Sequence, residues 1–148
     1  MRDAIGGVVN ITFIAIFMVV VSGYLAFSVS YNKAFKVKNK IISLLEQNEG
    51  YKLGVNDKIE DYMKNIGYNT DIDTSRVRNI DESWTCGQGY CIKYFPDNDS
   101  ADAGLPKGYY SVVTFVWIDV PIFNKFLPYL SFFQTRGDTM TIINATNE

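Results

Sequence analysis

The sequence predicts an α+β protein in which a long N-terminal transmembrane helix continues into an amphipathic stem and is followed by a small antiparallel-sheet head. Three observations support this fold class. The stretch from Ala4 to Asn32 contains no charged residue, apolar residues then recur at helical spacing as far as Leu44, and short runs of alternating apolar and polar residues follow. The predicted divisions are 1–7 for a short cytoplasmic N-terminus, 8–30 for the transmembrane helix, 31–50 for the stem and 51–148 for an extracytoplasmic head.

The apolar segment is long enough to cross a membrane. Val8 to Val29 consists almost wholly of Val, Ile, Phe, Ala, Met and Leu, and at about 1.5 Å per residue a helix of this length spans a bilayer. A cleaved secretory signal is the alternative, because Ala26 and Ser28 are small residues near the end of the run. The apolar part of such a signal is usually only about 7–15 residues long, so we predict a retained single-pass anchor in contact with membrane lipid.

The helix is predicted to continue past the membrane and to end near Gly50. Apolar or small residues stand three and four positions apart along this stem, so that they form one stripe. The stripe must be covered either by the protein's own head or by neighbouring subunits. We assign it to packing with partner subunits, through Ala34, Val37, Ile41 and Leu44.

The head is predicted to contain one short helix and about four antiparallel strands. Asn56 or Asp57 is a suitable N-cap for a helix that Gly67 ends. Arg136-Gly137-Asp138 is interpreted as a turn, because Gly between charged residues is common in turns. Alternation and β-branched or aromatic composition predict strands at 76–80, 91–95, 109–120, which is expected to be central, and 138–143.

Two signals disagree on the orientation of the head. The four lysines within Lys33–Lys40 follow the span, and by the positive-inside rule they would place the rest of the chain in the cytoplasm. Cys86 and Cys91, however, close a short loop with two glycines, as expected of a disulfide in an oxidising compartment. Unpaired structural thiols are the alternative for these two residues.

The composition excludes several classes of function. The 148 residues contain no histidine, so the chain lacks the commonest metal ligand and the base of Ser-His-Asp and Cys-His arrangements. Residues 1–40 carry five basic side chains against one acidic (+4), and residues 41–148 carry nine against fifteen (−6), which argues against a nucleic-acid partner. No acid–base pair stands at a fixed spacing, so we expect no enzyme activity, cofactor, metal site or small-molecule substrate.

These features together resemble a known family. A short basic N-terminus, an apolar helix with an amphipathic stem and a β-rich head with one disulfide loop look like a pilin or pseudopilin, and most closely like the TadE/TadF-like proteins of bacterial tight-adherence pili. The residues that carry the resemblance are Gly6-Gly7, the stem passage 31–42, the passage 112–123, Leu127-Pro128 and the passage 137–141.

The resemblance implies a non-enzymatic, membrane-anchored assembly component of a pilus or secretion apparatus, with its N-terminus inside the cell and its head outside. Its partners would be membrane lipid and other pilin-like subunits or an inner-membrane assembly platform. Such prepilins are cut after a Gly and carry Glu at the fifth mature position. A cut after Gly7 would place Thr12 there, and a cut after Gly6 would place Ile11. The alternative is a single-pass receptor or sensory ectodomain that binds a ligand through its two tryptophans and its Tyr-rich loops.

Overall fold

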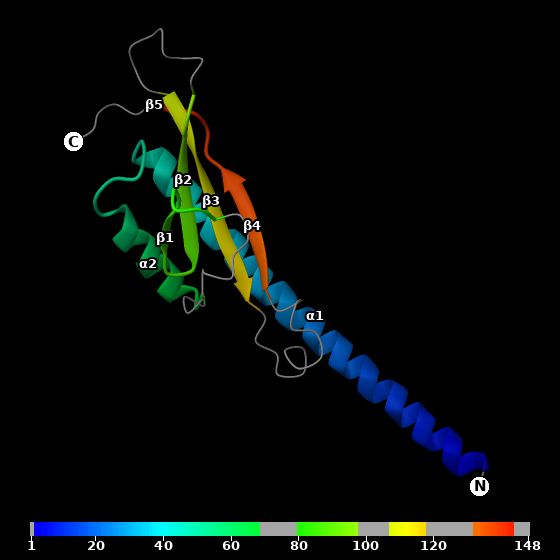
Figure 1. Ribbon diagram of the computed structural model, residues 1–148. Helices are drawn as coiled ribbons and strands as arrows, with labels where there is room; N and C mark the ends of the chain where they lie inside the picture. The colour runs from blue at the N-terminus through cyan, green and yellow to red at the C-terminus, as the bar shows by residue number, and fades with distance from the viewer. Residues whose placement is uncertain (1, 69–79, 98–106, 118–131, 144–148) are drawn as a thin grey trace.

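A computed structural model describes residues 2–68, 80–97, 107–117 and 132–143 and confirms the α+β fold class (Figure 1). One long helix runs into a head that contains a second helix and an antiparallel sheet. The helices are α1 (Arg2–Gln47) and α2 (Val55–Asn65), and the strands in the described ranges are β1 (Thr85–Gly87), β2 (Tyr90–Pro96), β3 (Lys107–Trp117), β4 (Phe132–Asp138) and β5 (Ile142–Ile143).

Helix α1 is continuous from the apolar segment into the head. It contains no proline, and its first half projects away from the head while its second half lies along the sheet (Figure 1). The helix is long and apolar enough to cross a membrane. It ends as predicted near Gly50, whose N–H donates to the Leu45 carbonyl at 2.9 Å. The left-handed residue of this C-cap is Glu49, with φ of 52°.

The sheet is built around β3. Its strands are ordered β1-β2-β3-β4, all neighbours are antiparallel, and β5 pairs with the beginning of β3 on the same side as β4. The strand predicted at 109–120 is therefore the central one, and that prediction is confirmed for residues up to Trp117, beyond which residues 118–120 lie outside the described part of the chain. The strand predicted at 91–95 is confirmed as the middle of β2.

The core lies between α1, α2 and one face of the sheet. The apolar stripe of the stem is its centre, because Ala34, Val37 and Ile41 are 0% exposed and Leu44 is 5% exposed. The Thr114 hydroxyl of β3 donates to the Ala34 carbonyl at 3.0 Å, which fixes the helix against the central strand. The stripe packs against α2 and the sheet through Val55, Ile59, Met63, Val112 and Val116.

The assignment of the stem stripe to partner subunits is therefore wrong. Ala34, Val37, Ile41 and Leu44 are buried within a single chain and leave no surface for a neighbour. The predicted alternative, cover by the protein's own head, is the arrangement found. The reason is geometric: the strands run alongside the second half of α1, so the sheet covers the stripe (Figure 1).

Helix α2 forms where it was predicted but begins earlier. Its N-cap is Gly54, with φ of 87°, and not Asn56 or Asp57. The earlier start brings Val55 into the core, where it is 1% exposed, and burial of this side chain outweighs a polar cap. The end at Gly67 is confirmed, because this residue has φ of 62° and closes the helix.

Two strand predictions need correction. Arg136-Gly137-Asp138 lies inside β4 and is not a turn. A Cβ on Gly137 would come within 3.0 Å of Ile42 Cδ1, so Gly at this position lets α1 lie against the strand. Of the strand predicted at 138–143, only Ile142–Ile143 form β5 and Asp138 ends β4. Residues 76–79 of another predicted strand lie outside the described residues, and Ile80 is not in a strand.

Candidate membrane and partner surfaces

The first surface is the bare half of α1, residues 7–25. Almost every side chain in it is exposed, and only 6% of the most apolar window of the helix is buried. Two of its polar side chains are bonded within the helix, because the Thr12 hydroxyl donates to the Val8 carbonyl at 2.9 Å and the Ser22 hydroxyl donates to the Met18 carbonyl at 2.8 Å, while Asn10 is exposed. An exposed helix that is apolar over most of its surface is suited to lipid or to other apolar helices.

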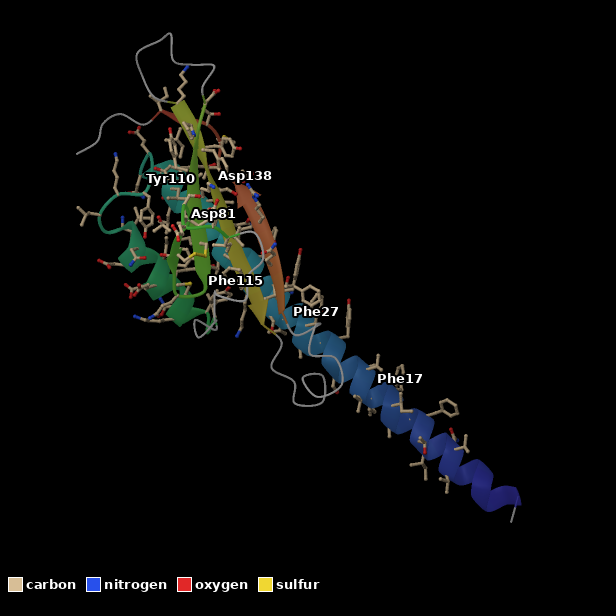
Figure 2. The ribbon with its side chains drawn as sticks, viewed as in Figure 1. Phe17, Phe27, Asp81, Tyr110, Phe115 and Asp138 are labelled. Carbon is tan, nitrogen blue, oxygen red and sulfur yellow. A yellow bond between two sulfur atoms is a disulfide. The ribbon has the colours of Figure 1, made fainter. Side chains whose placement is uncertain are left out.

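The second surface is an aromatic group at the point where α1 meets the sheet, here called the junction patch: Phe27, Tyr31, Phe35 and Phe133. The Phe27 ring lies 5.7 Å from Phe133 of β4 and 6.0 Å from Tyr31, and Tyr31 stacks 6.4 Å from Phe35. Figure 2 shows Phe27 where the helix leaves the sheet. Tyr31, Phe35 and Phe133 keep 43%, 41% and 38% of their surface exposed. The patch therefore continues the bare apolar surface onto the head.

The lysines after the apolar segment are used in packing of the head. Lys33 Nζ donates to the Gly67 carbonyl at 2.9 Å, at the C-terminal end of α2, where a cation is favoured. The side chain of Lys38 is buried, and its ammonium lies 4.4 Å above the Phe35 ring. Lys40 lies 5.9 Å above the Tyr62 ring. Three of the four lysines thus have a structural role that is independent of membrane topology.

The outward face of the stem is polar. Its residues follow one another at spacings of three and four along α1, and the Gln47 amide donates to the Ser43 hydroxyl at 3.1 Å. This face of the described stem therefore has no apolar stripe for a partner. The aromatic residues of the junction patch lie beside it. The polar face consists of Asn32, Lys36, Asn39, Ser43 and Gln47.

The predicted disulfide is present. Cys86 of β1 and Cys91 of β2 stand opposite each other in the register and are joined by an S–S bond of 2.06 Å. Tyr68 links the same hairpin to β3, because its hydroxyl donates to the Gly89 carbonyl at 2.8 Å and accepts the Phe115 N–H at 2.9 Å. Burial raises the pKa of the Tyr68 hydroxyl, so this tyrosine stays protonated.

A third surface lies on the face of the sheet opposite α1. Trp84 packs edge-on against Phe95, with ring centroids 6.4 Å apart, and the guanidinium of Arg136 lies 5.6 Å above Trp84. Lys93 lies 5.2 Å above Phe95 and 3.4 Å from the carboxylate of Asp81. The Ser83 hydroxyl, followed by Lys93, lowers the pKa of Asp81. The ring faces of this cluster are already occupied by cations of the same chain, so the cluster is not an open aromatic site.

The two glycines of the possible processing site lie inside α1. A Cβ on Gly7 would meet nothing within 4 Å, so packing within the chain does not require Gly there. Gly in the interior of a helix destabilises it by about 1 kcal/mol relative to Ala. Thr12 lies in the bare half, and Ile11 beside it is exposed.

The described residues contain no cluster of candidate metal ligands. Among them, no three His, Cys, Asp or Glu side chains are close enough to hold a metal ion. The junction patch was not predicted from the sequence, because Phe133 lies in a strand that was not predicted. Comparison of the chain with protein-family models, curated proteins and solved structures finds no match.

Proposed function

We propose that the protein is a membrane-anchored, pilin-like assembly component of a bacterial tight-adherence pilus or secretion apparatus, with its N-terminus inside and its head outside the cell. One observation carries the proposal: a single helix is bare and apolar over residues 7–25 and then forms the core of a folded head. A water-soluble protein does not leave such a surface uncovered. The bare half needs lipid while the subunit is in the membrane and neighbouring helices when it assembles.

The packing of the stem changes which residues contact partners. Because the head covers the stripe around Ile41, subunits cannot associate through it. The surface that remains for protein partners is the bare half of α1. Lateral association would therefore occur within the membrane or at its surface, while the polar face of the stem and the outer face of the sheet stay in contact with water.

Two further observations support an exported, processed subunit. The Cys86–Cys91 disulfide is the kind of bond that persists in an oxidising compartment. Gly7 has no packing role in the described chain, which is compatible with recognition by a peptidase. The structural use of Lys33, Lys38 and Lys40 gives a reason for basic residues after the span even with the head outside.

A single-pass receptor is the second candidate, and the buried stem stripe favours it, because an isolated receptor stalk also has to cover this stripe with its own head. The two functions differ in what the bare half of α1 contacts. An assembly subunit places other protein helices around it, whereas a lone receptor anchor is surrounded by lipid.

Photo-crosslinking within the bare half tests the proposal. A photoreactive phenylalanine analogue replaces Phe17, which is 65% exposed and lies in the middle of the bare half (Figure 2), in cells that express the complete apparatus. The matched control carries the analogue at Leu53, which is fully exposed at the other end of the head. We expect the analogue at position 17 to give a series of cross-linked oligomers of increasing size, and the analogue at position 53 to give no such series. Lipid adducts alone at Phe17, from a full-length protein in the membrane fraction, would contradict assembly and favour a receptor.

A further inference from the structure

The length of the apolar part of α1 before the head is close to the thickness of the hydrocarbon core of a bilayer. The charge-free part of α1 that precedes the head, from Ala4 to Leu25, is a helix about 33 Å long, and the hydrocarbon core of a bilayer is about 30 Å thick. The first contact with the head follows immediately, where Phe27 packs on Phe133 of β4. A helix that spans the membrane over this segment leaves no length for a stalk between the lipid and the head.

The end of the sheet lies at the same level along the helix. Phe133 is opposite Val116 in the register, so the last residues of β3 and the first residues of β4 are beside the Phe27 turn of α1. Figure 1 shows this end of the sheet where the bare half of the helix emerges. The strands then run away from that level alongside the second half of α1. If the bare half of α1 spans the membrane, this end of the sheet faces it.

The side chains at this level have the chemistry of a membrane interface. Tyr31 lies about 6 Å further along the helix axis than Phe27, so a span that ends near Leu25 would place it within the polar layer at the bilayer surface. Aromatic rings concentrate in that layer, because their apolar body and polar edge suit it. Tyr31 and Phe133 are partly exposed although they belong to a folded head. With the same span, Lys33, two residues beyond Tyr31, would lie near the lipid headgroups, where its ammonium is held by the Gly67 carbonyl.

We propose that the head rests directly on the outer surface of the bilayer, with Phe27, Tyr31 and Phe133 of the junction patch inserted into its interfacial layer. The inference rests on the membrane anchoring in the proposed function and adds a second contact between protein and lipid, made by the head itself. The occupant of the patch is lipid rather than protein, because the patch is continuous with the bare helix and lies at the depth where that helix leaves the hydrocarbon.

Depth-dependent fluorescence quenching tests the inference. Three single-tryptophan proteins are prepared with Phe in place of Trp84 and Trp117, and they carry Tyr31→Trp, Asn39→Trp or Phe17→Trp. Each is reconstituted in phosphatidylcholine and phosphatidylglycerol vesicles whose acyl chains are brominated near the headgroup or in the middle. The Tyr31→Trp protein reports the patch. The Asn39→Trp protein is the matched control, because position 39 is exposed on the same helix and lies about 12 Å further from the bare half.

We expect the shallow bromines to quench the Tyr31→Trp protein several-fold more than the Asn39→Trp protein, with emission shifted to the blue. If neither is quenched while Phe17→Trp is strongly quenched by the deep bromines, the anchor holds and the contact of the head with lipid is overturned. If Phe17→Trp is also not quenched, membrane anchoring fails and the inference fails with it.

A second measurement uses the unaltered chain, so that a folding defect in these variants does not decide the outcome. A phospholipid with a photoreactive diazirine near the headgroup is activated in the same vesicles, and the modified residues are located by mass spectrometry. Adducts at Tyr31 and Phe133 support the inference. Adducts confined to the bare half of α1 overturn it.

Discussion

Replacement of Ile41 by alanine tests whether the stem is held by the protein's own head. Ile41 is 0% exposed, and Val37 and Leu45, one turn away on either side, are also fully buried. Truncation of a buried Ile costs about 2–5 kcal/mol, and the upper half of this range applies where the surroundings cannot collapse into the cavity. The site lies between a continuous helix and the central strand of a sheet, so we expect a loss of about 3–5 kcal/mol in the free energy of unfolding.

The assay is thermal unfolding of the head in detergent micelles, followed by near-ultraviolet circular dichroism. For a head of this size each kcal/mol lowers Tm by about 4–8 °C, so Ile41→Ala should lower Tm by more than about 10 °C. Asn39→Ala is the matched control on the exposed face of the same helix, and it should change stability by less than about 0.5 kcal/mol. An Ile41→Ala protein with the Tm of the control and weaker cross-links to partner subunits would refute the intramolecular packing.

Three other changes have distinct expected outcomes. Val19→Asp puts a charge in the middle of the bare half of α1 and should disfavour membrane insertion by about 3 kcal/mol, seen as more protein released by carbonate extraction; equal retention of variant and parent would argue against the anchor. Loss of the Cys86–Cys91 bond by double replacement with Ser should lower the stability of the head by about 2 kcal/mol, because the closed loop is short. Thiols that are freely alkylated in intact cells without reductant would show that the bond is absent there. Gly108→Ala should destabilise the head by more than about 2 kcal/mol in the same unfolding assay, because its Cβ would lie 2.5 Å from a backbone carbonyl of β2, whereas Gly7→Ala should leave Tm unchanged or slightly raised.

The sequence predicted the elements whose own residues determine them. The long helix follows from a charge-free apolar run and from spacings of three and four, and both patterns are properties of a single segment. β3 follows in the same way from its β-branched and aromatic composition. β4 was missed because Arg136, Gly137 and Asp138 favour a turn locally, and only the approach of α1 explains a Gly inside that strand.

The surfaces were harder to predict than the elements. Periodicity shows that one face of the stem is buried, but the same pattern arises whether a sheet of the same chain or a neighbouring subunit covers it. The lysines were interpreted from the sequence only as a signal of membrane topology. Their contacts with Gly67 and Tyr62 could not be predicted, because these contacts join segments far apart in the sequence. The junction patch combines residues from α1 and β4, and no local pattern relates Phe27 to Phe133.

The stem is covered by strands that are synthesised after it, and this limits the order in which the protein can fold. The Thr114 hydroxyl bonds to the Ala34 carbonyl across 80 residues of chain, so the helix is synthesised long before the strand that covers it. At ~5–20 residues per second this gap lasts about 4–16 s. During that interval the apolar stripe around Ile41 lacks the strand that covers it in the folded protein. Slower elongation lengthens the exposure, so the yield of folded protein depends on the speed of synthesis as well as on the stability of the finished core.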